Sequence, residues 1–348
     1  MLILNEKDMR RTVTYGQVMD KVEEAFRLVC GGEFFMPERP VIASGENTLI
    51  YMPCFLPDGF GTKCLTVFPE NTAKGLPYID GLMLLNDGGT GKTKAIMDAK
   101  YLTGLRTGAA GGVSIRNFSR ADCKTAGVIG AGRQGFFQAI YASVARNIED
   151  IFFFDIAPKD WGAYMEDLAR DLARDLGGRA TGCSATGDRA QGDRAPGGKA
   201  PALHICDTVE ELLENSEIVI TATPATSPVM PDDAGLLRGK CFVAIGSYKP
   251  HMRELPDAIW QLVDCAYTEL VFALEESGDF SQPIAGGILQ KERVKLIGEW
   301  LAQEDRPLPS PGQTTFFKTV GMGLVDLCVG RLIYEKAMEL GVGQQVEI

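Results

Sequence analysis

Hydrophobic residues in the first third of the chain recur first at helical and then at strand spacing. Apolar positions between residues 15 and 28 fall on one helix face, and a Cys-Gly-Gly sequence ends the pattern. The pattern then shortens to strand-length segments separated by turns, at 48–52, 61–68 and 78–87. These features predict an N-terminal α+β unit around an antiparallel or mixed sheet, followed by one helix over residues 98–118.

A different pattern begins at Lys124. Short segments that are apolar throughout alternate with segments of helical spacing, which is typical of a parallel sheet covered by helices on both faces. We therefore predict a doubly wound α/β domain. Its strands are expected at 125–130, 151–155, 218–223 and 241–246, and its helices at 133–147, 160–176 and 208–215.

The stretch 177–202 interrupts this alternation with Gly, Ala, Arg and Asp. Its low hydrophobicity predicts a mobile surface loop without a catalytic part. After residue 314 the pattern is helical again, with one apolar stripe that is expected to pack on the N-terminal unit. We expect one domain from residues 1–118 plus 314–348, and a second from residues 119–313.

Composition narrows the classes of function. The chain has 348 residues, which at about 150 per domain agrees with two domains. A formal net charge of −11 without a basic block argues against nucleic acid as a partner. No apolar run approaches the roughly 20 residues that cross a bilayer, so no membrane span is expected. Nine cysteines without a C-x-x-C pair indicate reduced thiols and a cytoplasmic location, and with only two histidines no metal site is expected.

The candidate cofactor site is the sequence Gly130-Ala131-Gly132-Arg133-Gln134-Gly135, between an apolar strand and a helix. This G-x-G-x-x-G pattern is typical of a Rossmann-type domain that binds a dinucleotide, because its glycines allow a tight turn, a close approach of the pyrophosphate and close helix packing. The N–H groups at the start of the helix would face the phosphates. We expect all six residues to bind the cofactor.

Asp155 ends the next apolar strand, where a carboxylate can accept hydrogen bonds from the adenosine ribose. Because a carboxylate would repel a 2′-phosphate, NAD(H) is favoured over NADP(H). Arg133 and Lys159 keep NADP(H) open as the second choice. The alternative for Asp155 is that it only caps the turn at Ala157-Pro158.

Thr221, Ala222 and Thr223 follow the fourth strand of the domain. Ligands of doubly wound sheets lie beyond the carboxyl ends of the strands, so these residues are expected to flank the nicotinamide half of the cofactor. Gly246, after the next strand, is predicted to bind the cofactor with them. The alternative is a simple connecting loop.

Further motifs resemble the ornithine cyclodeaminase/μ-crystallin family in their order and over nearly the whole chain except 177–202. They include MPERP at 36–40, GTKC at 61–64, LTGLRTG at 102–108, REL at 253–255 and TTFFKTVGMGLVDL at 314–327. The resemblance implies a homodimeric oxidoreductase of amino or imino acids. It also implies a Rossmann domain plus an α+β substrate-binding and dimerisation domain, which the N-terminal half and the C-terminal helix form.

By position, Arg39 and Arg106 match the family residues that hold the substrate carboxylate, and Lys63 matches the catalytic lysine. The chemistry agrees, since a guanidinium binds a carboxylate at two points. Lys63 lies in an otherwise apolar strand, where its burial requires a carboxylate partner or a lowered pKa. The resemblance requires all three side chains to converge beside the nicotinamide ring.

One departure concerns Tyr248, which stands where cyclodeaminases and related alanine dehydrogenases carry an aspartate after the fifth Rossmann strand. A phenol is a poor base near neutral pH but an adequate proton donor. The family branch that reduces cyclic ketimines also lacks this aspartate. We therefore predict Tyr248 as a catalytic residue in the reduction of a cyclic ketimine such as pyrroline-2-carboxylate to the L-amino acid.

Three alternatives remain at this point. The first is ornithine cyclodeamination, with Asp264, Glu269 or another carboxylate as the base. The second is an enzyme similar to alanine dehydrogenase, and the third is a protein that binds its dinucleotide without catalysis. The joint presence of Arg39, Lys63 and Arg106 argues against the third.

Overall fold

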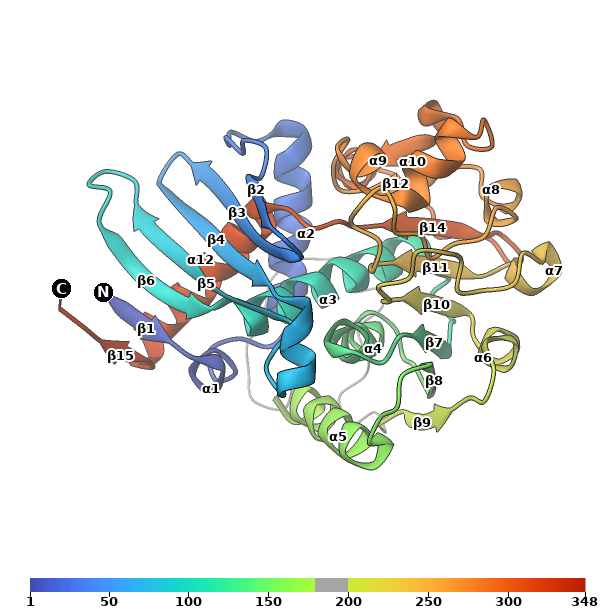
Figure 1. Cartoon of the computed structure of the whole chain (residues 1–348), viewed down its shortest axis with the longest axis horizontal. Coiled ribbons are helices and arrows are strands. Elements are labelled where there is room, and N and C mark those ends of the chain that lie inside the picture. Colours follow the sequence, from blue (N-terminus) through green and yellow to red (C-terminus); the bar gives the residue numbers. More distant parts are fainter. Residues whose placement is uncertain (179–199, 348) are drawn as a thin grey trace. The chain divides into compact units, whose positions relative to one another are not determined.

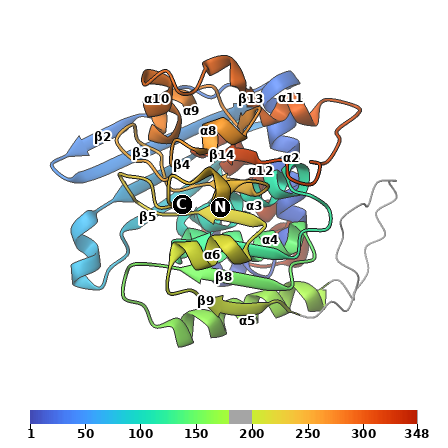
Figure 2. The same cartoon turned by 90° about the vertical axis from the view of Figure 1, so that its right-hand side faces the viewer.

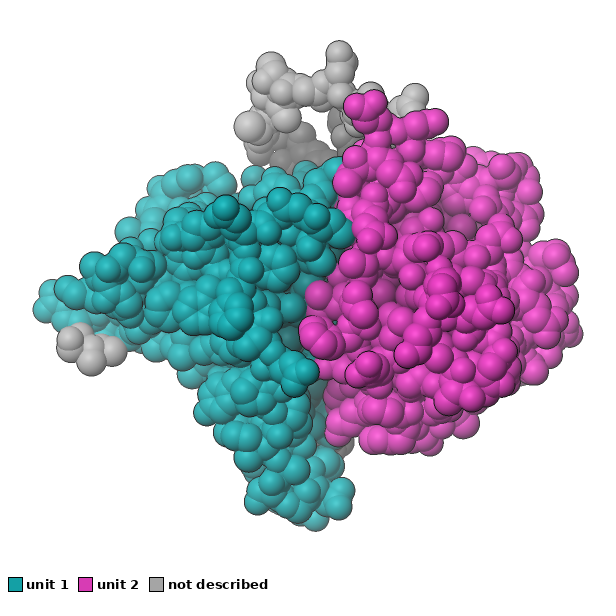
Figure 3. All heavy atoms as spheres, turned by 90° about the horizontal axis from the view of Figure 1, so that it is seen from above, with its two compact units in different colours: residues 1–106, 321–348 teal, residues 107–320 magenta. Residues whose placement is uncertain are grey.

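The computed structural model describes residues 1–178 and 200–347. Most of the predicted mobile loop at 177–202 lies outside the described residues. The chain divides into two compact units, Met1–Arg106 with Gly321–Ile348 (unit 1) and Thr107–Val320 (unit 2), coloured separately in Figure 3. No helix among the described residues has both the length and the apolar character that a membrane span requires.

Unit 1 contains a mixed sheet with the strand order β15-β1-β6-β5-β4-β3-β2. Only β1 and β6 pair in parallel, and the other neighbours are antiparallel. The two chain ends lie together in this unit, because the Met1 amino group donates to the Val346 carbonyl at 3.0 Å (Figure 1). The strands are β1 (Leu2–Leu4), β2 (Val41–Ser44), β3 (Asn47–Leu56), β4 (Gly59–Val67), β5 (Ile79–Asp87), β6 (Thr93–Asp98) and β15 (Gln344–Gln345).

Helices pack on one face of this sheet. The helix α12 (Gly323–Leu340) contacts β3, β4 and β5, and it also packs against α2 (Tyr15–Gly31), as the sequence pattern predicted. Side chains in β4 alternate between buried and half-buried, so every second residue faces the helices. The unit also holds α1 (Glu6–Met9), the 3-10 helix η1 (Pro69–Lys74) and the first turns of α3 (Ala99–Phe118).

Unit 2 is the predicted doubly wound domain. Its strands are all parallel, in the order β13-β12-β14-β11-β10-β7-β8-β9. The core strands β7 (Thr125–Ile129), β10 (Ile218–Thr221), β11 (Cys241–Ala244) and β14 (Thr315–Lys318) have few or no exposed side chains, which explains their continuous apolar sequences.

The remaining elements of unit 2 complete the sheet and its covering layers, and α5 lies close to β9 in both cartoon views (Figures 1 and 2). The strands are β8 (Asp150–Phe154), β9 (Ala202–Ile205), β12 (Ala266–Thr268) and β13 (Val294–Leu296). The helices are α4 (Arg133–Ala145), α5 (Trp161–Gly178), α6 (Val209–Asn215), α7 (Ala234–Leu237), α8 (Ile259–Leu262), α9 (Ala273–Glu276), α10 (Gly278–Ala285), α11 (Ile297–Leu301) and the 3-10 helix η2 (Lys291–Arg293).

The structure differs from the sequence prediction after residue 314. Residues Thr315–Lys318 form β14 between β12 and β11, and the helix begins only at Gly323. Four consecutive buried residues show no period, so a short central strand and the start of a buried helix look alike in sequence. The two units divide inside α3 and after β14, whereas the sequence predicted domain boundaries at 118/119 and 313/314.

Candidate active site

Lys63 lies on the helix-covered face of β4 and is completely buried. Its register neighbours across the sheet are Met52 on β3 and Met83 on β5, with Met97 beyond on β6, and all three are buried. Two residues earlier, Gly61 allows α12 to approach closely, since a Cβ there would lie 3.1 Å from Leu327 Cδ1. A lysine in this row needs a partner for its charge.

Asp326 on α12 provides that partner. One of its oxygens, Oδ1, accepts a hydrogen bond from Lys63 Nζ at 2.8 Å and another from Arg106 Nε at 2.9 Å. Asp326 is fully buried, and its second oxygen, Oδ2, has no hydrogen-bond partner among the described residues. Three segments far apart in sequence, β4, α3 and α12, therefore meet at one carboxylate.

The pKa of Lys63 is lowered to about 7, and burial is the largest cause. The positive charges of Arg106 and Arg39 also act to lower this pKa, whereas the charge of Asp326 and its hydrogen bond act to raise it. The structure thus combines both conditions under which a buried lysine was expected, a carboxylate partner and a lowered pKa. A lysine of this kind carries its proton through only part of the neutral pH range, which suits proton transfer.

Arg39 is half-buried and lies just before β2. Its charge acts on Lys63, so this predicted residue belongs to the same neighbourhood. Arg106 is positioned by Gly321, whose φ of +78° favours glycine and whose added Cβ would lie 2.4 Å from Arg106 Nη1. The structure therefore brings Arg39, Lys63 and Arg106 together in unit 1. Asp326 is the member that sequence reasoning missed, although the buried lysine called for such a carboxylate.

In unit 2, the glycine motif has the geometry that a dinucleotide site requires. Gly130 has a φ of +94°, and a Cβ there would lie 2.7 Å from the Ala222 carbonyl. A Cβ at Gly135 would lie 2.1 Å from the Gly130 carbonyl, so α4 packs closely on the turn. At Gly132, by contrast, no atom lies within 4 Å of a built Cβ, and no side chain caps α4 at this N-terminus. This open, uncapped helix end is what a pyrophosphate would occupy.

Asp155 connects the glycine motif to the turn that follows β8. Its Oδ2 accepts a hydrogen bond from the Ala131 N–H in the glycine motif, and its Oδ1 accepts one from Ala157, both at 2.9 Å. Lys159 Nζ lies 3.8 Å from Oδ2. Asp155 therefore does cap the turn, which was the alternative reading, and it also fixes the glycine motif. Its contact with a ribose stays a prediction.

The loops after β10 and β11 meet at a shared carboxylate. Thr223 donates from its backbone and its hydroxyl, and Gly246 from its backbone, to the buried side chain of Glu254. Thr221 is buried at the end of β10, and Ala222 donates to the Ile129 carbonyl of β7. Sequence reasoning missed Glu254, although it lies in the quoted REL motif.

The structure places Tyr248 in unit 2, in the loop after β11, half-buried and with Lys249 Nζ 5.6 Å from its ring centre. Of the alternative carboxylates, Asp264 is exposed. Glu269 is buried and accepts hydrogen bonds from the Thr319 hydroxyl at 2.7 Å and from the Val320 N–H at 2.8 Å. Glu269 is therefore engaged in joining the ends of β12 and β14.

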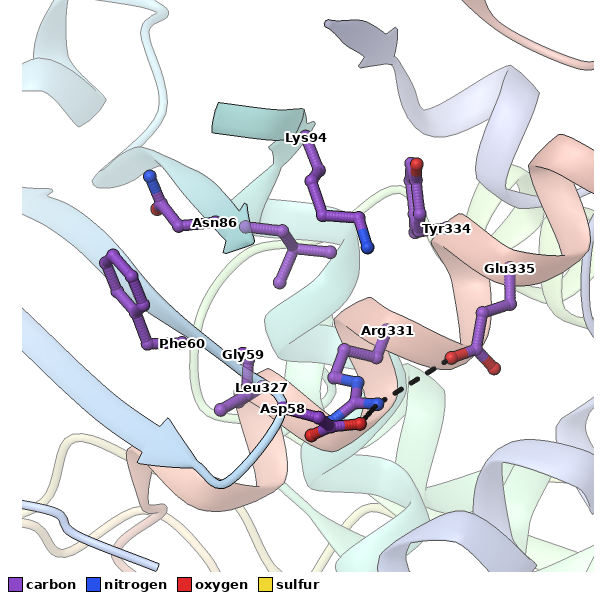
Figure 4. Close-up of a pocket in the computed structure, with 10 residues that line it drawn as sticks. Asp58, Gly59, Phe60, Asn86, Lys94, Leu327, Arg331, Tyr334 and Glu335 are labelled. Atoms are coloured by element: carbon purple, nitrogen blue, oxygen red, sulfur yellow. Dashed lines mark hydrogen bonds and ion pairs between the residues drawn. The ribbon is translucent and has the colours of Figure 1, made fainter. Parts of the chain in front are cut away.

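A separate pocket of unit 1 contains none of the predicted site residues (Figure 4). Arg331 binds Asp58 through two hydrogen bonds there, and Lys94 Nζ lies 5.3 Å from the ring centre of Tyr334. In the part of the chain that the structure describes, no group of three or more His, Cys, Asp or Glu side chains could hold a metal.

Comparisons with known proteins agree with these features. The model of the "Ornithine cyclodeaminase/mu-crystallin family" matches residues 1–182 and 198–341. A Δ(1)-pyrroline-2-carboxylate reductase of Bacillus cereus is 28% identical over the full length of both chains. The structure of Thermococcus litoralis Δ(1)-pyrroline-2-carboxylate reductase in complex with NADH and L-proline is 30% identical, covers 99% of this chain and 100% of that chain, and has a TM-score of 0.84. An archaeal alanine dehydrogenase dimer with bound NAD is 27% identical, covers 100% and 99% of the two chains, and has a TM-score of 0.81.

Proposed function

Because the chain belongs to the ornithine cyclodeaminase/mu-crystallin family, we propose that it is an NAD(H)-dependent reductase of cyclic imino acids. The proposed reaction converts Δ1-pyrroline-2-carboxylate to L-proline. Two of the similar proteins are named as reductases of this compound, and one of them was solved with NADH and L-proline. The proposal assigns the substrate to residues of unit 1 and the dinucleotide to unit 2.

The buried cluster of Lys63, Arg106 and Asp326 carries the proposal. A small imine with a carboxylate needs cationic groups that bind the carboxylate and a donor that is protonated near neutral pH. Lys63, with its pKa lowered to about 7, meets the second need. The reduced imine nitrogen takes this proton, and Lys63 regains one from solvent in each turnover.

Arg39 and Arg106 are proposed to bind the substrate carboxylate. The hydrogen bond from Arg106 to Asp326 uses only Nε, so the two terminal nitrogens keep the planar fork that matches a carboxylate. Asp326 would fix this fork and the Lys63 ammonium relative to each other, because both donate to the same oxygen. When bound, the dinucleotide supplies the hydride for the imine carbon.

Several residues of unit 2 are proposed to hold NAD(H). The six residues of the glycine motif would bind the pyrophosphate, and Asp155 the adenosine ribose. Residues 221–223 and Gly246 would flank the nicotinamide half. Arg133 and Lys159, the latter close to Asp155, are the residues that would favour NADP(H) instead.

The direct test is to mix the purified protein with NADH and Δ1-pyrroline-2-carboxylate and to follow NADH absorbance and L-proline formation. We expect NADH to be consumed, L-proline to form, and NADPH to be used less efficiently than NADH. Formation of proline and ammonia from L-ornithine with NAD, without imine reduction, would contradict the proposal and identify a cyclodeaminase. NADH binding without turnover of any imino acid in a broad panel would identify a noncatalytic protein.

We also infer a homodimer that forms through the outer face of the unit 1 sheet. Tyr51 on β3, Cys64 on β4 and Leu82 on β5 are register partners, so they lie in one row on the face opposite Lys63. Tyr51 and Leu82 are exposed, as is Phe55 on the same face of β3. Exposed apolar side chains in such a row are typical of a protein interface. The similar archaeal alanine dehydrogenase is described as a dimer.

A cytoplasmic location belongs to the same proposal. The cysteines among the described residues form no disulfide with one another, which is the usual state in a reducing compartment.

A further inference from the structure

The loops that follow β10 and β11 are fastened to each other by one carboxylate. Glu254 Oε1 accepts hydrogen bonds from the Thr223 N–H at 2.7 Å and from the Thr223 hydroxyl at 2.9 Å. Its Oε2 accepts from the N–H groups of Gly246 at 2.7 Å and Ser247 at 3.2 Å. Since β10 and β11 are parallel neighbours, both loops leave the sheet at the same edge. This is the edge at which doubly wound domains bind ligands.

The position of Glu254 is itself fixed by buried groups. Asp279 on α10 accepts hydrogen bonds at its Oδ1 from the N–H groups of Glu254 and Leu255, at 2.7 and 3.0 Å. Lys318, at the end of β14, places its Nζ 3.4 Å from Asp279 Oδ2 and 3.8 Å from Glu254 Oε2. Glu254, Asp279 and Lys318 are all buried, so the cation compensates two carboxylates that would otherwise repel each other.

The two loops leave no room for another arrangement around this carboxylate. A Cβ at Gly246 would lie 2.0 Å from the Thr223 carbonyl and 2.6 Å from Glu254 Oε1. The β10 loop in turn lies against the glycine motif, where a Cβ at Gly130 would lie 2.7 Å from the Ala222 carbonyl. Because the glycine turn holds the β10 loop at Ala222, loss of the Glu254 hydrogen bonds would displace Thr223 and Gly246, which are proposed to flank the nicotinamide half, and not the glycine motif.

We propose that Glu254 is a positioning residue for the dinucleotide, which sets the β10 and β11 loops at the separation that the nicotinamide half requires. The inference rests on the proposed binding of NAD(H) to unit 2. Four donors converge on the two oxygens of Glu254. Only a carboxylate accepts from all four, because an amide would place its own N–H groups opposite two of these donors. Glu254 acts through the loops and is not assigned a contact with substrate or cofactor.

The test compares Glu254→Gln with the unmodified protein in titrations of NADH and of ADP-ribose, a ligand that lacks the nicotinamide. We expect the affinity for NADH to fall by about 10-fold or more, the effect of one or two mispaired buried hydrogen bonds, and the affinity for ADP-ribose to change less than about twofold. Thermal unfolding is measured in parallel, so that a general loss of stability is recognised.

Glu217→Gln is the matched control. Glu217 also accepts hydrogen bonds from two backbone N–H groups, those of Lys124 and Thr125, but it lies at the amino ends of β7 and β10. Its substitution is expected to lower the unfolding temperature while both ligand affinities stay unchanged.

A second variant, Lys318→Met, tests the inference without altering Glu254 or the loops that donate hydrogen bonds to it. Without the cation, Glu254 faces only Asp279 and the loop donors, so it binds a proton at higher pH and then loses acceptor capacity. NADH affinity in this variant should fall as the pH is lowered from about 8 to about 6, while the unmodified protein shows a smaller change.

Unchanged NADH affinity in Glu254→Gln, or equal losses for NADH and ADP-ribose, would overturn the inference. If Glu254→Gln does not fold, the absence of any added pH dependence in Lys318→Met overturns it instead. An unmodified protein that binds no NADH in these titrations contradicts the proposed function itself, which is a different result.

Discussion

Single residues decide the chemistry of unit 1, and Lys63 shows how. An ordinary lysine ammonium is protonated throughout the neutral range, but the pKa of Lys63 is lowered to about 7, chiefly because its side chain is completely buried. Asp326 works against this effect and keeps part of the lysine population charged. The balance between one carboxylate and two guanidinium groups therefore sets the pH range in which this lysine can donate a proton.

Asp326→Asn should shift the pH dependence of imine reduction. In the unmodified protein, kcat/KM is expected to fall above about pH 7 as Lys63 loses its proton. Since Asp326 raises the pKa of Lys63, its replacement lowers that pKa, and the fall should begin about one pH unit lower or more. Steady-state kinetics across a pH series measure this. Asp58→Asn, which alters only the exposed pair with Arg331, should keep the original profile, and an unshifted profile in Asp326→Asn would disprove the role.

Tyr248→Phe separates the two candidate proton donors. If the phenol donated the proton, its removal would slow reduction by about 10²-fold, the usual effect of a positioned acid. Because the pKa of Lys63 is lowered into the neutral range, we expect the rate to stay within about threefold and Lys63 to remain the donor. Single-turnover rates with NADH and the imine measure the difference, and a large loss would return the role to Tyr248.

At the scale of elements, the buried cluster of Lys63, Arg106 and Asp326 depends on how closely two helices and one strand approach. Residues from β4, α3 and α12 meet at Asp326, and the chain just before α12 runs against the Arg106 side chain at Gly321. Sequence patterns predicted β4, α3 and α12 as separate elements, but no local pattern contains their contact. Periodicity likewise predicted the core strands of unit 2 and missed β14, whose neighbours supply the burial that defines it.

Gly321→Ala should weaken substrate binding specifically. The added methyl group would strain the backbone at a φ of +78° and collide with Arg106 Nη1, which lies 2.4 Å from the built Cβ. We expect KM for the imino acid to rise by about 10-fold or more, while NADH affinity changes little. Gly330→Ala on α12 is the control, because its nearest neighbour lies 3.5 Å away and alanine favours a helix; this variant should keep the original KM. Equal KM values in both variants would contradict the positioning of Arg106 by Gly321.

At the scale of the whole molecule, the two faces of the unit 1 sheet differ in exposure to solvent. One face buries Lys63 under α12, and the other exposes the row that contains Tyr51 and Leu82. A net charge of −11 makes copies of this chain repel one another, so association requires a defined apolar surface.

Leu82→Arg should therefore convert the proposed dimer to monomers. A charge in the centre of an apolar interface is costly when its partner surface offers no counter-charge. Sedimentation equilibrium is expected to show a dimer for the unmodified chain and a monomer for the variant, with the same thermal unfolding of unit 1. Lys7→Arg, an exposed substitution on α1 that preserves charge, serves as the control. A monomeric unmodified chain, or a dimer that survives Leu82→Arg, would contradict this interface.

The sequence alone determined the features that repeat locally or form a contiguous motif. Continuous apolar segments specified a parallel sheet, and the glycine motif specified the dinucleotide turn, because each depends on neighbours within a few residues. The family motifs also selected Arg39, Lys63 and Arg106. Their position beside a nicotinamide ring stays a prediction.

Tertiary structure decided which charges share a partner. Lys63 and Asp326 are 263 positions apart, and Arg106 and Asp326 are 220 apart, yet both cations donate to one oxygen. The same holds for Glu254, which joins two loops and faces a lysine from a strand that sequence patterns did not predict. A pKa or a loop position depends on distances of a few ångströms between such groups, and folding alone brings them together.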